Sequence, residues 1–298
     1  MDIVDSQAHL GPGGADKMLA AMDAIGIKSV LIDEWWMGTP GDPGYRVGKD
    51  GQGFRTTSPT AELAAWSYPG RFSYLIRVDR LDPDMHTVVR LARDCKHVRA
   101  LRISPGMNRA ELKAFAAGEL DTVFAAAGDY GFPIFVQISG NTHLLARYLE
   151  KFPKVKVIIC HCGMPPGRRL WPIFARMEGL PDSNDYWGKV GSEPPAQAFD
   201  KVLRIAEQPN VALKWAHAPT MFDAAGYPNE GTNAFLRKAL NAFGAERIMW
   251  ASDISANQTG ESWAELLFAV RNNQDLSQRE KQYVLGATAR HWLGWQAS

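Results

Sequence analysis

The chain has 298 residues, 46% hydrophobic and 22% charged, so it can bury the core of one large α/β domain or of two ordinary ones. Its formal net charge of +1 gives no basic field for a nucleic acid, and no apolar run approaches the roughly 20 residues that span a bilayer. The first ten residues lack the basic start of a signal peptide, and three cysteines do not make a disulfide framework. We therefore expect a cytoplasmic protein without nucleic-acid or membrane partners.

Short apolar runs alternate with amphipathic helical patterns along the whole chain. Strands are predicted at residues 2–9, 29–33, 72–78, 98–103, 133–138, 155–160, 211–215 and 248–251. Helices are predicted at residues 15–25, 84–95, 109–130, 141–151, 195–207, 233–243, 261–272 and 277–292. Such alternation predicts a parallel sheet, and eight units at this length favour a (β/α)8 TIM barrel over a doubly wound sheet. No break in composition marks a second domain, so we predict a single α/β barrel domain over residues 1–298.

Long segments follow the second, sixth and seventh predicted strands, and in a barrel they would overhang its C-terminal face. The first of them, residues 34–59, is rich in Gly and Pro and contains Trp35 and Trp36. Loops of this length inside a compact domain are often lids or binding loops, and a surface insertion is the alternative. The two tryptophans favour a binding loop, because such side chains prefer to be covered.

Polar residues occur at the predicted C-terminal end of every strand, where the active site of a (β/α)8 barrel forms. In strand order they are Gln7, His9, Asp33, Glu34, Arg77, Asp79, Arg102, Ser104, Gln137, His161, Lys214, His217 and Asp253. Any one of them could simply meet solvent, but their joint placement on one rim favours an active site. For Asp253 alone, the N-cap of the following helix is an equally good interpretation.

Strand alternation assigns faces to the residues next to these polar positions. It places Asp5 on the same inward face as Gln7 and His9. It also points Cys160 and Cys162 away from His161, which predicts buried packing roles for both cysteines.

Four motifs follow one another from the first predicted strand to the last. They are Ile-Val-Asp-Ser-Gln-Ala-His at residues 3–9, Val-Arg-Ala-Leu-Arg-Ile at 98–103, Val-Ile-Ile-Cys-His-Cys-Gly at 157–163 and Arg-Ile-Met-Trp-Ala-Ser-Asp at 247–253. Together they resemble the amidohydrolase superfamily. More closely, they resemble the amidohydrolase-related branch of 2-pyrone-4,6-dicarboxylate lactonase, other lactonases and aromatic-acid decarboxylases. The resemblance covers the whole barrel and leaves the substrate open.

The resemblance also implies where a metal would bind. The usual metal site of the superfamily has His-x-His on strand one, one histidine each on strands five and six, and an aspartate on strand eight. In this chain His9, His161 and Asp253 match three of these positions, whereas Gln7 and Gln137 stand where histidines are expected. A neutral amide is a poor zinc ligand, so we predict a site without a metal cofactor. The alternative is a weakly held zinc or manganese ion on His9, His161 and Asp253.

The resembling lactonases suggest a reaction that needs no metal. We expect a hydrolase that opens a carboxylated ring lactone in catabolism, with Asp253 as the general base for water. His9 and His161 would stabilise the oxyanion. The alternatives are a metal-dependent decarboxylase or hydratase of an aromatic or unsaturated carboxylic acid, and a non-catalytic binding protein. A buried carboxylate at position 253 without a task weighs against the last of these.

A small anionic molecule is the expected partner of this site, in a monomer or homodimer. The guanidinium of Arg102 matches an arginine of the family that engages a substrate carboxylate, and its planar fork suits that task. The residues expected to bind the substrate are Gln7, Arg102, Gln137, Arg77, Lys214 and Trp35.

Overall fold

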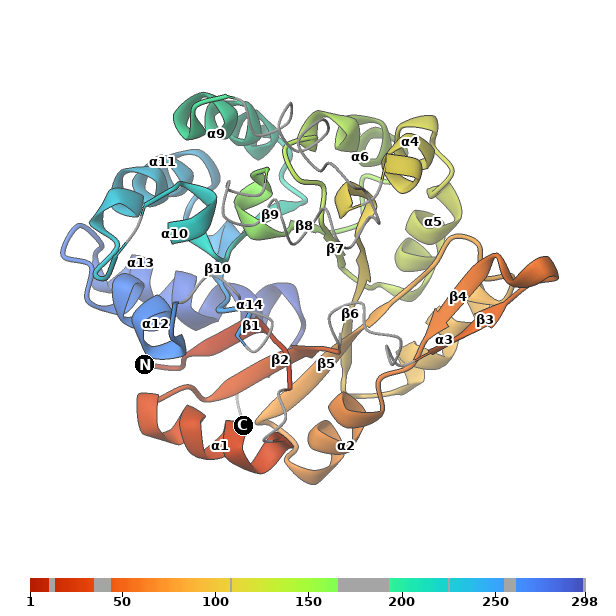
Figure 1. Cartoon of the computed structure of the whole chain (residues 1–298), viewed down its shortest axis with the longest axis horizontal. Helices are drawn as coiled ribbons and strands as arrows, with labels where there is room; N and C mark the ends of the chain where they lie inside the picture. The colour runs from red at the N-terminus through yellow and green to blue at the C-terminus, as the bar shows by residue number, and fades with distance from the viewer. Residues whose placement is uncertain are drawn as a thin grey trace, which may run out of the picture.

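Eight parallel strands form one sheet in the order β1-β2-β5-β6-β7-β8-β9-β10 (Figure 1). The computed structural model describes residues 1–10, 14–34, 44–107, 109–165, 193–224, 226–254 and 261–296. The strands are β1 (Val4–Ala8), β2 (Ser29–Asp33), β5 (Phe72–Arg77), β6 (Val98–Ile103), β7 (Ile134–Val136), β8 (Val157–Ile159), β9 (Val211–Trp215) and β10 (Ile248–Trp250). All eight lie where the hydrophobic pattern predicts them.

The last strand returns to the first. Beyond the end of β10, the backbone N–H of Asp253 donates to the carbonyl of Gln7 at 2.9 Å, and that of His9 donates to Ile254 at 3.0 Å. These bonds bring the two ends of the sheet together, and β1 and β10 are neighbours in Figure 1. The fold is therefore the predicted (β/α)8 TIM barrel, with the strands near closure.

Helices connect the strands and surround the sheet (Figure 1). They are α1 (Gly14–Ile25), α2 (Pro59–Ser67), α3 (Met85–Asp94), α4 (Arg109–Ala117), α5 (Asp121–Tyr130), α6 (Ala146–Lys151), α9 (Pro195–Leu203), α10 (Ala218–Met221), α11 (Asn233–Phe243), α12 (Trp263–Arg271), α13 (Gln278–Gln282) and α14 (Thr288–Trp292). The helix predicted at residues 109–130 is divided into α4 and α5, because Gly118 takes a left-handed φ of 88° between them. In the described parts of the chain, no helix is both long enough and apolar enough to cross a membrane.

The segment predicted as a long loop over residues 34–59 contains regular structure. Strands β3 (Gly44–Val47) and β4 (Gly53–Thr56) form an antiparallel hairpin within it. Trp35, which we predicted to bind substrate, lies outside the described residues, as do Trp36 and the middle of the segment after β8.

The interior of the barrel is filled in layers. Each strand contributes one side chain to an apolar layer, which consists of Val4, Leu31, Leu75, Ala100, Phe135, Ile158, Ala212 and Met249. Two positions further along their strands, the next inward side chains are Asp33, Arg77, Arg102, Gln137 and Lys214. The apolar layer thus supports a polar layer at the C-terminal ends of the strands, where the sequence places the active site.

Both cysteines near His161 are buried as predicted, but their expected orientation is wrong for Cys160. Cys160 belongs to the interior cluster, two positions after Ile158 and level with the polar layer, whereas Cys162 packs in the outer core between strands and helices. Strand β8 ends at Ile159, and His161 and Cys162 then take left-handed φ values of 51° and 55°. This turn ends the alternation on which the prediction relied.

Candidate active site

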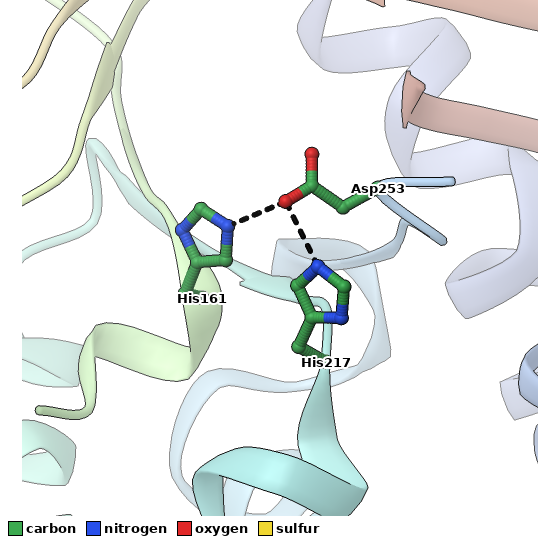
Figure 2. Close-up of side chains that lie close together, drawn as sticks. All are labelled: His161, His217 and Asp253. Carbon is green, nitrogen blue, oxygen red and sulfur yellow. Dashed lines mark hydrogen bonds and ion pairs between the residues drawn. The ribbon is translucent and has the colours of Figure 1, made fainter. Parts of the chain in front are cut away.

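Three histidines converge on the carboxylate of Asp253. The Nε2 atom of His9 lies 2.9 Å from Oδ1 of Asp253. The other carboxylate oxygen, Oδ2, lies 2.8 Å from Nε2 of His161 and 3.0 Å from Nε2 of His217. Figure 2 shows the rings of His161 and His217 directed at this same oxygen from two different segments. All four side chains are buried.

Local backbone geometry turns three of these side chains toward one another. His161 follows β8, His217 follows β9 and Asp253 follows β10, and their φ values are 51°, 51° and 58°. Left-handed conformations are uncommon for residues other than glycine, with an energy cost of roughly 1–2 kcal/mol each. Such strain tends to occur at functional sites, where the surrounding structure holds it in place.

Gln7 links Asp253 to a second carboxylate and to a buried lysine. Its Nε2 donates to Oδ1 of Asp253 and, at 3.3 Å, to Oδ2 of Asp33. Its Oε1 accepts a hydrogen bond from Nζ of Lys214, whose side chain is fully buried. The amide therefore connects β1 with side chains from β2, β9 and the end of β10.

Asp33 binds the two arginines that were predicted to bind substrate. Arg77 donates from Nε and Nη2 to its two oxygens at 2.8 and 2.7 Å, and Arg102 donates from Nη1. The other terminal nitrogen of Arg102, Nη2, donates to Oε1 of Gln137 at 2.6 Å. Gln7, Arg77, Arg102, Gln137 and Lys214 therefore belong to one buried polar network.

The tautomer of His9 follows from its partners. Its Nδ1 hydrogen-bonds the backbone carbonyl of Asp33, which can only accept, so Nδ1 carries a proton. Its Nε2 lies against a carboxylate oxygen of Asp253, so both ring nitrogens of His9 are held by oxygen atoms.

Burial and charge set the protonation of the other groups. Burial by itself raises the pKa of Asp253, but the charge of His9 and the bonds from His161 and His217 hold it well below its usual range. Burial likewise opposes ionisation of Asp33, yet Arg102 and Arg77 keep its pKa low. Burial, together with the charge of Lys214, lowers the pKa of His161 to about 3. At neutral pH the site thus contains two carboxylates and a neutral His161.

Asp5 lies on the opposite face of β1 from Gln7, contrary to the prediction that the two share one face. It supports the site through contacts with the backbone. Its Oδ1 accepts from the backbone N–H of Gln7 at 3.1 Å and of Ser252 at 3.0 Å. Its Oδ2 accepts from Nε1 of Trp263 on α12 at 2.8 Å and from the Ser252 hydroxyl. The pairing of β1 with β2 is irregular between Asp5 and Ala8, which shifts the alternation by one residue.

A cavity of about 350 Å³ opens at the ends of β5 and β6. It is lined by Arg46, Gln52, Arg77, Val78, Asp79, Arg80, Leu81, Arg102, Ile103, Ser104, Pro105, Glu111 and Leu120. Arg46 comes from the β3–β4 hairpin, so this hairpin forms one wall. The Nε atom of Arg102 is buried without a hydrogen-bond partner among the described residues. The cavity thus brings several guanidinium groups together, which suits an anionic ligand.

His161, His217 and Asp253 could also hold a metal ion. Their candidate ligand atoms all lie within 4.8 Å of one another, and the three residues are buried. Two imidazoles and a carboxylate are a common ligand set for zinc, and Nδ1 of each histidine has no partner in the described part of the chain. The residues therefore fit a divalent cation. This set contains His217 in place of the His9 that we inferred from sequence.

His217 is the member of the site to which sequence analysis gave no role. The strand pattern did place it at the rim, two residues after the end of β9, but no motif marked it. Asp33 was likewise placed at the rim without a role, and it is the partner of both arginines.

Comparisons with known proteins agree with this architecture. The amidohydrolase family model matches residues 4–295, and a search of the curated proteins returns no match. The chain is similar to the solved structure of an amidohydrolase from Burkholderia multivorans with bound zinc, at 16% identity and a TM-score of 0.71, covering 99% of this chain and 100% of that one.

Two further solved structures come from different reaction classes. One is assigned as a 2-pyrone-4,6-dicarboxylic acid hydrolase from Pseudomonas putida, with 18% identity, a TM-score of 0.64 and coverage of 100% and 99%. The other is 5-carboxyvanillate decarboxylase from Sphingomonas paucimobilis, with 14% identity, a TM-score of 0.60 and coverage of 99% of each chain. At these identities the structural likeness shows the fold alone. Because the family model spans nearly the whole chain, the protein is an enzyme of the amidohydrolase family.

Proposed function

We propose that this protein is a hydrolase that opens a lactone ring bearing a carboxylate, with Asp253 as the general base for water and no requirement for a metal. The observation that carries the proposal is the ionised carboxylate of Asp253, which is held among three histidines at the C-terminal mouth of the barrel. The arginine-lined cavity at the ends of β5 and β6, whose Arg102 is linked to Asp253 through Asp33 and Gln7, supports an anionic substrate.

The contacts of Asp253 suggest how water and substrate enter. Its two oxygens accept from Gln7, His9, His161 and His217, which together occupy the acceptor positions of a carboxylate. A water molecule can bind Asp253 only if one donor leaves. A substrate carbonyl could attract the N–H of His161 or His217, and this exchange would free a carboxylate lone pair for the water. The same N–H would then stabilise the oxyanion, a contribution of ~3 kcal/mol per good donor.

Ring opening then follows a balanced sequence. The water oxygen bonds to the lactone carbonyl carbon while Asp253 takes one water proton. Breaking the ring carbon–oxygen bond returns that proton to the departing ring oxygen, so the reaction adds one water in total. Because Asp253 has a lowered pKa, it is a weak base, and an activated ring ester suits it better than an amide.

The polar network supports binding of an anionic ring. Arg77 and Arg102 line the cavity and are held in place by Asp33, so their positions are fixed before a substrate arrives. The Nε of Arg102 is a buried donor without a partner among the described residues, and a substrate carboxylate that displaced its surroundings would satisfy it. Gln137 accepts a hydrogen bond from Nη2 of the same guanidinium. Its role is therefore to hold Arg102 in place.

A second candidate function is a metal-dependent decarboxylase or hydratase of an unsaturated or aromatic acid, which the grouping of His161, His217 and Asp253 favours. A divalent cation held by these residues would supply Lewis-acid activation of a substrate oxygen. Arg77 and Arg102 would orient the carboxylate of the acid in this case too.

Product analysis on chelator-treated protein tests the two candidates against each other. We expect a panel of carboxylated lactones to yield one equivalent of acid per ring opened, measured by pH-stat titration, with no loss of rate after chelation. Release of carbon dioxide from an aromatic acid that depends on added zinc or manganese would support the decarboxylase and contradict the proposed lactonase. Elemental analysis of untagged protein gives the metal content for both assays.

A further inference from the structure

Lys214 is a fully buried cationic side chain in the polar layer of the barrel. Its Nζ donates to Oε1 of Gln7 and lies 5.9 Å from the centre of the Phe135 ring. Burial lowers the pKa of Lys214, and the charges of Asp253 and Asp33 favour its protonated form. A lysine in such a place has no solvent-facing function, and it does not line the arginine cavity.

The bond from Lys214 determines which way the Gln7 amide points. An amide has an acceptor end and a donor end, and Nζ of lysine can donate to the acceptor end. With Oε1 held by Lys214, the NH2 group of Gln7 must face the carboxylates of Asp253 and Asp33, and it donates to both. The reversed amide would place its oxygen against two carboxylates, which is unfavourable.

This arrangement affects what the site can bind. The groups that Gln7 and Lys214 direct toward Asp253 are N–H donors and positive charge, neither of which can ligate a cation. Lys214 contacts Gln7, and the Gln7 amide in turn donates to Asp253, so the charge of Lys214 lies close to the residues that could hold a metal. In a low-dielectric interior, like charges repel more strongly than they do in water.

We propose that Lys214 is a positioning residue that fixes the Gln7 amide with its donor end toward Asp253 and, through its charge, disfavours a divalent cation at His161, His217 and Asp253. The role replaces the substrate contact expected from sequence. It deepens the proposed function, because it gives a physical reason for catalysis without a metal. Its test by metal binding does not depend on the reaction.

The experiment measures zinc affinity by isothermal titration calorimetry on chelator-treated full-length protein at one pH. Lys214→Gln removes the charge but retains a donor to Gln7, whereas Lys214→Met removes both. Lys154→Gln is the matched control, because it removes one positive charge from an exposed surface position. Each variant is first checked for folding by near-UV circular dichroism, and Lys214→Gln decides the matter if Lys214→Met fails to fold.

We expect the zinc Kd to fall by at least about tenfold in Lys214→Met and by a smaller factor in Lys214→Gln, with Lys154→Gln unchanged. Adding His217→Ala to Lys214→Met should abolish the gain, which assigns it to the proposed ligands. Zinc affinities within about twofold of the unmodified protein in both Lys214 variants would overturn the inference. A gain that survives His217→Ala would overturn it as well.

Hydrolysis of a lactone substrate tests the positioning role separately. Lys214→Met should lose more of kcat than Lys214→Gln, because only the former releases the Gln7 amide, and KM should change little in both. Equal losses in the two variants would contradict the positioning role. If the unmodified protein opens no lactone, the proposed function fails, while the zinc titration still decides the inference about Lys214.

Discussion

The Nε2 atom of His217 lies 3.0 Å from Oδ2 of Asp253, although the two residues follow different strands and neither lies in regular structure. This contact adds His217 to the group that sequence analysis had joined, which consists of His9, His161 and Asp253. The contacts of His217 and His9 involve different oxygens of Asp253, so the two histidines lead to different predictions for metal binding.

His217→Ala and His9→Ala should therefore separate two possible ligand sets. If a cation binds His161, His217 and Asp253, His217→Ala should weaken zinc binding at least about tenfold. His9→Ala should not weaken zinc binding, because Nδ1 of His9 is committed to a backbone carbonyl and its Nε2 faces the other carboxylate oxygen. Calorimetric titration of both variants measures this, and the reverse order would restore the ligand set inferred from sequence.

Asp253→Asn tests the general base directly. The amide keeps the size of the side chain but cannot take a proton from water, so kcat/KM on a confirmed lactone should fall at least about 100-fold. Asp50→Asn, at an exposed position in the hairpin, is the matched control and should retain full activity. Activity of Asp253→Asn within about tenfold of the unmodified enzyme would exclude the proposed base.

Arg102→Met tests whether Arg102 recognises a carboxylate on the substrate. Loss of the guanidinium should lower kcat/KM for a carboxylated lactone by about 100-fold and should affect a neutral lactone far less. The change also releases Gln137 and one bond to Asp33, so Gln137→Met serves as a control for disruption of the network. Equal losses on charged and neutral lactones would mean that Arg102 supports the structure and does not recognise a carboxylate.

The raised pKa of Asp5 should be measurable in the pH dependence of the protein's stability. Burial raises the pKa of this carboxyl to about 6, against hydrogen bonds from Ser252 and Gln7 that favour its ionised form. A raised folded-state pKa means that the folded protein holds a proton that the unfolded chain has released. The contribution of Asp5 is therefore fully present below the unfolded pKa of about 4 and is lost as pH rises through 6.

Asp5→Asn removes this titration. Between about pH 4 and pH 7, the free energy of unfolding of the unmodified protein should fall relative to that of Asp5→Asn by on the order of 3 kcal/mol. Denaturant unfolding at a series of pH values measures the difference. A constant difference over this range would mean that Asp5 has an ordinary pKa. The effect of His161 on the free energy of unfolding has the opposite sign. Because its folded-state pKa is about 3, stability is lost as pH falls below 6.5, and this loss is the same in both proteins.

Much of this architecture was determined by local sequence. Short apolar runs predicted the position and order of the eight strands, because a strand buried on both faces must be apolar for several residues in succession. The same pattern placed Gln7, Asp33, Arg102, Lys214 and Asp253 at one end of the barrel, since parallel strands carry their C-terminal ends to a common rim. The four motifs added the family, which the match over residues 4–295 confirms.

The tertiary structure decided which of these rim residues meet. The irregular pairing of β1 moved Asp5 off the face of Gln7, and such a shift depends on the neighbouring strand, not on the sequence of β1 alone. The left-handed turns at His161 and His217 directed both rings at Asp253, whereas alternation would have continued along the strand. Gln7 contacts both Asp33 and Lys214, and the three residues come from separate strands. Their contacts therefore exist only after the barrel closes. Sequence thus determined which groups reach the rim, and three-dimensional packing determined their partners, charges and chemistry.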